Sequence, residues 1–399
     1  MSPPRNHPLE SSATARRMEA FFAWTWDSGL SEKPPLDPEY LWERGASGFA
    51  SQDEHSGRSP DDVEDFRQRL EKLCISLGEE ADLNALGHAM AYGQLRNAIA
   101  KRHRLGKLWR DRPHLLETAI APPIIVVGQM RSGTTRLHRL LAADPAHAGT
   151  MFCNSIEPVP SEPVDWRALK ARMALAMARS VNPWLETMHP FGAMRVDEEL
   201  GWLALSLSPC ALEAQYRIPS FLEWSEARDS GPIYHEFARI LRVDSALEEN
   251  ADRPRILKCP QFSEDLAALL DQFPDSRLVI ARRKQSEMLE SSVSMVASQM
   301  GCQTDSADVG QIRSEWRRKL ALRETRMEQA LRTFAGPTSA VDFETLGEDW
   351  ESEITRVYRE LDIELEAAAL EAMRAEMAQS TRDGHHGHRE QIESFASEN

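Results

Sequence analysis

Residues 128–145, GQMRSGTTRLHRLLAADP, contain the spacing of a loop that binds phosphate. The register Gly-x4-Gly-x-Thr is filled by Gly128, Gly133 and Thr135. The lysine usual after the second glycine of such loops is replaced by Thr134, and Arg131 supplies a cation three residues earlier. Successive backbone N–H groups at a turn that opens onto a helix attract an anion. The segment therefore predicts a phosphate site that works without the usual lysine.

Two parts of a site for nucleoside triphosphate hydrolysis are missing from the pattern. No lysine follows Gly133, and Asp342 is the only acidic residue at the end of an expected strand that could hold Mg²⁺. Ser132, Thr134 and Thr135 add hydroxyl donors to the loop. The loop thus suits a phosphate that is bound but not transferred with the help of a metal. A turn of this type that binds nothing is the alternative.

A second cationic cluster lies in RRKQSEMLESSVSM, residues 282–295. Arg283 ends an expected strand, and Ser291 follows eight residues later in an expected helix. Both can contact one phosphate, the arginine with two parallel hydrogen bonds. With Lys258, these residues collect positive charge in a protein whose net charge is −16. Two separate anion sites indicate a ligand with phosphates at both ends; the alternative is a solvated basic turn.

Short β-branched runs alternate with helical segments from residue 119 onward. The expected strands are residues 123–128, 255–260, 277–283 and 338–346. This alternation predicts an α/β fold with a P-loop-like parallel sheet flanked by helices. Ligands of such sheets bind at the carboxyl ends of the strands, so the segments of Arg131 and Arg283 are expected to face one crevice.

The first part of the chain has a different pattern. Residues 1–118 are charged and contain no strand-like run, and they predict a helical N-terminal annex to a main domain of residues 119–399. The expected annex helices are residues 13–27, 61–77 and 83–105. A stretch rich in proline and glycine separates the first from the second and is expected to be a loop.

Composition excludes several classes of protein. A net charge of −16 argues against nucleic-acid binding. Five scattered cysteines without a C-x-x-C pair suit reduced thiols in the cytoplasm. The longest apolar stretch, residues 201–212, is too short to cross a bilayer, and the first residues lack the apolar core of a signal peptide. We therefore expect a cytoplasmic protein without a membrane span.

The segment PPIIVVGQMRSGTTRLHRLLAADP, residues 122–145, resembles the PAPS-dependent sulfotransferases, in particular their large bacterial branch. The resemblance continues through SIEPVP, RILKCP and FPDSRLVIARR, and is looser in VDFETL; altogether it covers residues 119–399. It implies the sulfotransferase form of the P-loop-like fold. It also implies 3′-phosphoadenosine 5′-phosphosulfate (PAPS) as the sulfuryl donor, 3′-phosphoadenosine 5′-phosphate (PAP) as the product, and no metal.

The resemblance assigns roles to residues of the two clusters. The 5′-phosphosulfate would be held by Arg131, Ser132, Gly133, Thr134 and Thr135. The 3′-phosphate would be held by Arg283 and Ser291, and Lys258 would stand near the bridging oxygen of the donor. Lys258 and Arg131 are thereby implied as catalytic. A lysine at a strand end that points to solvent is the alternative for Lys258.

The chain also departs from the bacterial pattern. The usual HRDP after the third strand is RRKQ here, and a histidine often found after the strand-end lysine is replaced by Phe262. The base must therefore come from elsewhere or be unnecessary. The candidates are His189, which Glu198 and Glu199 could orient, and Glu157, which follows a probable strand. A buried loop histidine and a capping glutamate are the respective alternatives.

The acceptor cannot be identified from the pattern. A hydroxyl of a small molecule, glycan or lipid is expected, an amine less so, and a homo-oligomer is compatible with the sequence. The histidine-rich segment 384–390 is expected to close over the nucleotide rather than to bind a metal. Two further interpretations remain open: a P-loop nucleotide kinase or NTPase, and a nucleotide-binding protein that has lost its chemistry.

Overall fold

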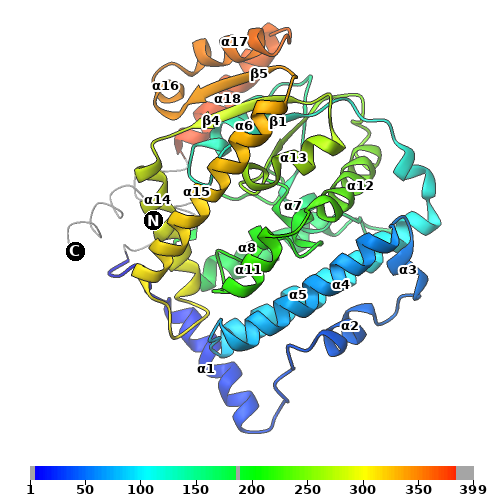
Figure 1. Cartoon of the computed structure of the whole chain (residues 1–399), viewed down its shortest axis with the longest axis vertical. Coiled ribbons are helices and arrows are strands. Elements are labelled where there is room, and N and C mark those ends of the chain that lie inside the picture. The colour runs from blue at the N-terminus through cyan, green and yellow to red at the C-terminus, as the bar shows by residue number, and fades with distance from the viewer. Residues whose placement is uncertain (1–4, 186–188, 383–399) are drawn as a thin grey trace.

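Five parallel strands form one sheet in the computed structural model of the chain, which describes residues 5–185 and 189–382 (Figure 1). The strands are β1 (Ile124–Val127), β2 (Ala148–Gly149), β3 (Arg255–Lys258), β4 (Arg277–Arg282) and β5 (Thr338–Asp342). Their order across the sheet is β2-β3-β1-β4-β5, and every neighbouring pair is parallel. The predicted α/β fold with a parallel sheet is confirmed.

The register of the sheet sets which strand ends meet. Val126 of β1 pairs with Lys258 on one side and with Val279 on the other, so β1 lies between β3 and β4. All residues of β1 and β3 are buried, as expected for parallel strands covered by helices on both faces. The segments that follow β1, β3 and β4 therefore leave the sheet at the same edge.

The observed strands are shorter than the sequence pattern predicts, and two of them depart from it most. The strand expected at 338–346 ends at Asp342, which pairs with Arg282, the last residue of β4. Beyond that point no paired backbone remains on β4, and the chain turns into helix α16. The strand expected before Glu157 is only the two-residue β2, which pairs with β3 at Arg255.

Helices cover both faces of the sheet. The described helices of residues 112–382 are η1 (Pro113–Glu117), α6 (Thr134–Ala142), α7 (Phe152–Ile156), α8 (Arg167–Val181), α10 (Leu200–Ala204), η2 (Pro209–Ala211), α11 (Pro219–Glu226), α12 (Gly231–Leu247), α13 (Phe262–Gln272), α14 (Gln285–Met300), α15 (Val309–Thr333), α16 (Phe343–Glu348), α17 (Trp350–Glu360) and α18 (Ala367–Arg382). Ile125 and Val127 pack in one core with α12 and α13, whereas Ile124 and Val126 pack in another with α6 and α17. This alternation follows from the two-residue period of a strand.

The annex is helical, as predicted. Its helices are α1 (Ala13–Asp27), α2 (Pro38–Ala46), α3 (Gln52–His55), α4 (Pro60–Glu79) and α5 (Ala85–Asp111). The stretch expected to be a loop contains α2 and α3. Helix α2 begins where the Asp37 side chain accepts a hydrogen bond from the Tyr40 N–H at 2.9 Å, with Pro38 in the first turn. The sequence contains this start signal, but the prolines near it led to the prediction of a loop.

The annex packs directly on the rest of the chain. A buried cluster joins Phe66 of α4 and Ile99 of α5 to Leu212, Tyr216 and Phe221, which follow the sheet's first strands in sequence. In Figure 1, α1 and α2 lie at the end of the molecule opposite α16, α17 and α18. The proposed boundary at residue 118 stays a prediction. Among the described residues, no helix combines the length and apolar character needed to cross a membrane.

Candidate active site

The turn between β1 and α6 has the backbone geometry of an anion-binding nest. Gly133 has φ +89°, and a Cβ atom at this position would lie 2.3 Å from the ring of Phe343. Glycine meets both constraints, because it lacks a Cβ and tolerates positive φ. As the residue that caps α6, Gly133 offers no side-chain oxygen to the first turn of the helix. The first N–H groups of the helix could therefore donate to an anion bound at this turn.

The hydroxyl groups of the turn have different environments. The Ser132 Oγ donates a hydrogen bond to the backbone oxygen of Gln129 at 2.7 Å, so its proton holds the turn together. Thr134 is buried and Thr135 is half-buried at the start of α6. The Gln129 side chain in turn donates to the Glu324 carboxylate of α15 at 2.7 Å. The turn is thus tied to α15 as well as to β1.

The two cationic clusters expected as separate anion sites are in direct contact. The Nε of Arg131 donates to the Oγ of Ser291 at 2.8 Å, and the Nη1 of Arg283 donates to the backbone oxygen of Arg131 at 2.9 Å. Because β1 and β4 are neighbours in the sheet, the segments that follow them meet at one edge. Arg131, Arg283 and Ser291 therefore form one continuous rim, which we call the cationic rim.

Two like charges lie close together in the cationic rim. Burial and the nearby charge of Arg283 lower the pKa of Arg131 to about 10. The Arg283 guanidinium pairs with Glu287 of its own helix turn at 3.0 Å, and that carboxylate is well exposed. A phosphate bound here would relieve the repulsion between the guanidinium groups. The rim therefore has the electrostatics of an anion site.

Phe343 is a residue of the site that the sequence analysis did not identify. The Arg283 guanidinium lies over its ring, 4.3 Å from the centroid, and the same ring contacts the position of Gly133. Cation–π contact holds a guanidinium plane in one orientation. Phe343 thus lies between the turn after β1 and the arginine after β4. Its sequence signal was its place in VDFETL, where the resemblance is looser.

Lys258 lies at the carboxyl end of β3 with its side chain 3% exposed. Its Nζ is 2.7 Å from the Glu198 carboxylate, and its backbone N–H donates to Glu199 at 2.9 Å. A lysine that points to solvent, the alternative considered from the sequence, is inconsistent with this burial. Glu198 and Glu199 together hold the lysine beside the turn after β1.

His189 contacts a different acid from the one expected. Its Nε2 lies 2.9 and 3.1 Å from the two oxygens of Asp197, which also contacts Arg139 at 3.5 Å and accepts from the Glu198 N–H at 2.8 Å. The expectation that Glu198 or Glu199 orients this ring was wrong, because both carboxylates contact Lys258. Burial alone would raise the pKa of Asp197, but the charges and hydrogen bond of His189 and the charges of Lys258 and Arg139 hold it well below its usual range. Asp197 is therefore a charged partner for the ring.

Glu157 lies apart from this cluster. Its carboxylate pairs with Arg104 of α5 and, at 3.7 Å, with Lys170 of α8. It is the residue that ends α7, so it does not directly follow a strand. The structure brings His189 and Lys258 together through Asp197 and Glu198, whereas Glu157 is directed toward the annex. Its role as the base stays a prediction.

The three residues His189, Asp197 and Glu198 offer ligand atoms within 4.8 Å of one another, a spacing that would suit a metal ion. Arg139 already pairs with Asp197, and Lys258 already pairs with Glu198. Both carboxylates are thus neutralised by protein cations, which argues for a polar network. The histidine-rich segment 384–390 lies outside the described residues.

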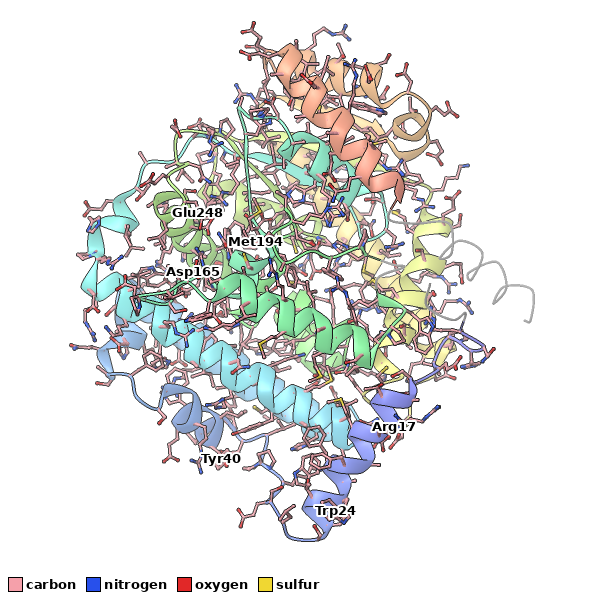
Figure 2. The ribbon with its side chains drawn as sticks, turned by 180° about the vertical axis from the view of Figure 1, so that it is seen from behind. Arg17, Trp24, Tyr40, Asp165, Met194 and Glu248 are labelled. Carbon is pink, nitrogen blue, oxygen red and sulfur yellow. The ribbon has the colours of Figure 1, made fainter. Side chains whose placement is uncertain are left out.

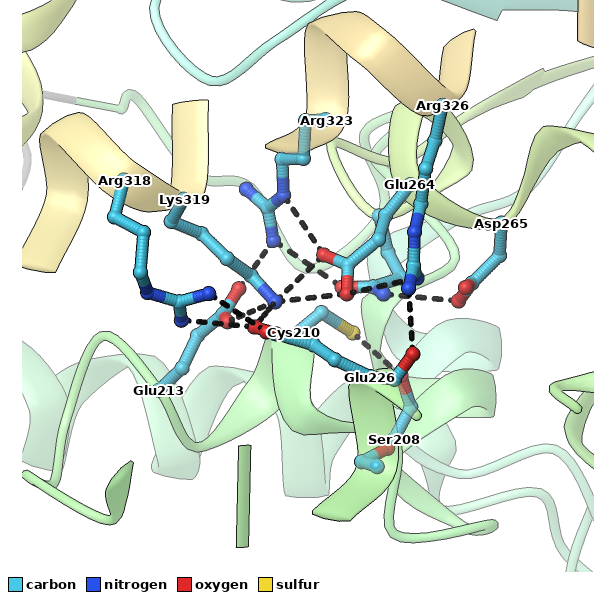
Figure 3. A network of polar contacts seen from close by, with 12 residues as sticks. Ser208, Cys210, Glu213, Glu226, Glu264, Asp265, Arg318, Lys319, Arg323 and Arg326 are labelled. Carbon is cyan, nitrogen blue, oxygen red and sulfur yellow. Dashed lines mark hydrogen bonds and ion pairs between the residues drawn. The ribbon is translucent and has the colours of Figure 1, made fainter. Parts of the chain in front are cut away.

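A buried charge network joins α15 to the segment that follows β3 (Figure 3). The Lys319 ammonium of α15 lies 2.7 Å from Glu264 and 2.9 Å from Glu226, and Arg323 donates to Glu264 at 3.2 Å. Arg323 also pairs with Glu213. Glu264 lies six residues after Lys258, so the network anchors α15 against the segment that leaves β3. Loss of one partner from such a network leaves a buried charge uncompensated.

Glu199 gives the stability of the protein a pH dependence. Burial raises the pKa of its carboxyl to about 8 from an ordinary value of 4.5, although the backbone N–H of Lys258 acts in the opposite direction. Between these values the folded chain retains a proton that the unfolded chain has released, so stability falls as pH rises toward 8. The unfolding free energy of each protein is measured by urea titration at pH 5 and at pH 8.5. Between these pH values the wild type is expected to lose more unfolding free energy than Glu199→Gln, and the two losses should differ by more than about 1.4 kcal/mol. Glu79→Gln, an exposed change at the end of α4, serves as the control. Equal losses in the wild type and Glu199→Gln would contradict the assignment.

Comparison with known proteins identifies related chains. A family model described as the sulfotransferase family matches residues 122–367. The omega-hydroxy-beta-dihydromenaquinone-9 sulfotransferases Stf3 of Mycobacterium bovis and Mycobacterium tuberculosis are each 28% identical over 169 residues. That match covers 41% of this chain and 42% of each relative, so the chain matches less than half the length of these curated relatives.

Solved structures extend the likeness to the annex. Sulfotransferase STF1 of Mycobacterium tuberculosis has a TM-score of 0.73 at 24% identity, over 92% of this chain and 100% of that chain. Sulfotransferase STF9 of Mycobacterium avium has a TM-score of 0.75 at 19% identity, over 86% and 87% of the two chains. Since the annex holds 118 of the 399 residues, both matches reach into it. At these identities the likeness establishes the fold.

Proposed function

The chain belongs to the sulfotransferase family, and we propose that it transfers a sulfuryl group from PAPS to a hydroxyl of a lipid-like acceptor. The observation that carries the proposal is the cationic rim, in which Arg131 contacts Ser291 and Arg283 contacts Arg131. Adjacent guanidinium groups and an open helix N-terminus suit a donor with phosphates on both sides of its ribose. These residues fit that donor.

Each part of the rim has a distinct task in this proposal. The turn after β1, with Arg131 and the first N–H groups of α6, would hold the 5′-phosphosulfate. Arg283 and Ser291 would hold the 3′-phosphate, with Phe343 fixing the plane of the guanidinium. When bound, the donor supplies the sulfur–oxygen bond that breaks during transfer.

In the proposed reaction, Lys258 acts on the leaving phosphate and His189 acts on the acceptor hydroxyl, on the two sides of the transferred sulfuryl group. The Lys258 ammonium can offset negative charge that develops on the leaving phosphate, and its burial strengthens that effect. His189, with Nε2 directed at Asp197, has its other ring nitrogen available to accept the proton of an acceptor hydroxyl. Asp197 would then stabilise the charged ring.

The nature of the acceptor is inferred from the relatives. The Stf3 proteins are named for an omega-hydroxy derivative of dihydromenaquinone-9, a lipid-like molecule with a hydroxyl. We propose an acceptor of that chemical class for this chain, with an amine as the less favoured alternative. A location in the cytoplasm and a homo-oligomeric state stay predictions.

Nucleotide preference tests the donor assignment. PAP at a hundred times its dissociation constant is expected to stabilise the chain by about 2.7 kcal/mol. ATP with Mg²⁺ is expected to give a clearly smaller thermal shift, because it lacks the 3′-phosphate. Arg283→Ala should remove most of the preference for PAP, whereas Arg282→Ala, an exposed arginine one residue earlier, should keep it. Equal thermal shifts with PAP and with ATP and Mg²⁺ would contradict the assignment of PAPS as the donor and favour the kinase or NTPase interpretation. Strong PAP binding without transfer to any hydroxylated lipid would favour a non-catalytic protein.

A further inference from the structure

Helix α8 exposes apolar side chains along its outer face. Leu169, Met173 and Met177 are spaced four residues apart, so they form one row, and they are 46%, 65% and 54% exposed. The inner face of the same helix buries Ala171 and Leu175. A surface helix normally exposes polar residues opposite its buried face. Among the described residues, the row on α8 is therefore an apolar surface without a cover.

The charged side chains that α8 itself carries have one sign. Arg172 and Arg179 flank the row on one side and Lys170 flanks it on the other, and all three are exposed. Residues 167–181 contain no acidic residue, in a chain whose net charge is −16. Arginine and lysine stems that flank an apolar row can extend their charged ends outward from it. An apolar row between cations matches a surface with an apolar interior and anionic head groups.

Helix α1 extends this face. The side chains of Phe21 and Trp24 are 57% and 56% exposed, and Arg17 lies one turn before Phe21. The start of α1 is joined to the end of α8, because the Ser12 hydroxyl donates to the backbone oxygen of Val181 at 2.7 Å. Figure 2 shows α8 running from Met194 at one end toward Arg17 on α1, with Trp24 further along α1. Exposed tryptophan is typical of segments at a membrane interface.

We propose that the exposed faces of α8 and α1 form a docking surface for an anionic lipid bilayer. The inner face of α8 connects this surface to the candidate base. Ala171 and Leu175 pack in one cluster with Phe191, whose ring lies 4.3 Å from the ring of His189. A bilayer in contact with α8 is therefore separated from His189 by little more than one helix. That last link rests on the proposed function, whereas docking itself does not.

Charge distinguishes a bilayer from a second copy of the chain. In a symmetric dimer built on α8, the patch would face itself, and Arg172 and Arg179 would meet the same cations of the other copy. Like charges brought together in this way oppose association. An anionic bilayer instead gains from each cation. The observations therefore favour the lipid surface.

Flotation with vesicles tests the proposal. The full chain is expected to bind vesicles of phosphatidylcholine and phosphatidylglycerol in equal parts at least about tenfold more tightly than vesicles of phosphatidylcholine alone, and added salt should reduce this difference. The double change Met173→Glu and Met177→Glu should abolish binding. Ile75→Glu, an exposed apolar residue on α4, is the matched control and should bind like the wild type. Arg172→Glu should weaken binding to the anionic vesicles only.

Two measurements keep the result interpretable. The thermal shift with PAP is measured for every variant, because a variant that retains the shift is folded. If the wild type itself shows no shift with PAP, the proposed function fails, and this result is separate from the result of the vesicle experiment. Sedimentation velocity gives the oligomeric state of each variant. If the folded wild-type protein does not bind anionic vesicles, the docking proposal is overturned. A wild-type dimer that Met173→Glu and Met177→Glu convert to a monomer, without vesicle binding, assigns the surface to a second copy and overturns it as well.

Discussion

Lys258→Ala is expected to lower turnover by about a hundred-fold or more, while the affinity for PAP changes much less. The ammonium is buried at the end of β3, paired with Glu198, and lies beside the turn that would hold the phosphosulfate. A cation there interacts most strongly with charge that appears only as the sulfur–oxygen bond breaks. Turnover is measured with saturating donor, and affinity is measured from the thermal shift with PAP.

The matched control for this change is Lys107→Ala. Lys107 is an exposed annex lysine that pairs with Asp111 on its own helix, so its loss should leave turnover unchanged. Because Lys258→Ala leaves Glu198 without its partner, the melting temperature is recorded for each variant. A folded Lys258→Ala variant with normal turnover and a raised Michaelis constant would show that the lysine binds the donor but does not assist bond cleavage.

Much of the candidate phosphate site was predictable because its residues lie in short, local patterns. The turn after β1 follows from two glycines and an apolar strand, and its need for glycine is visible in the φ of Gly133. Arg283 and Ser291 follow from a strand end and a helix spacing. Their direct contact with the segment of Arg131 was not predicted, since sequence does not give the order of strands. Because β1 and β4 are neighbours, the two candidate anion sites lie side by side and share the contacts of Arg131.

The surroundings of His189, the candidate base, depended on contacts that sequence patterns do not encode. Residues 197–199 are three consecutive acids, and only the fold decides that Asp197 contacts His189 while Glu198 and Glu199 contact Lys258. Phe343 was missed for a similar reason. Its partners Gly133 and Arg283 are far away in the chain and meet it only at the edge of the sheet.

His189→Ala is expected to lower turnover with a hydroxyl acceptor by about a hundred-fold or more, because the proton of the hydroxyl then lacks a positioned acceptor. The ring is partly buried, contacts Asp197 through Nε2 and stacks near Phe191, so its orientation is fixed from two sides. Glu157→Gln is expected to have a much smaller effect, since its carboxylate is engaged by Arg104 and Lys170. Turnover of each variant is measured across pH with labelled donor and a hydroxylated lipid.

The shape of the rate–pH profile separates the two candidates. The wild type should lose rate at acidic pH, because the base must be unprotonated to accept a proton, and His189→Ala should lose that decline together with its rate. His114→Ala, an exposed histidine in η1, is the control and should keep the wild-type profile. If His189→Ala keeps both the wild-type rate and the acidic decline, and Glu157→Gln removes both, then His189 is a packing residue against Phe191. The proton would then leave through Glu157, on the side of the site that faces α5 and α8.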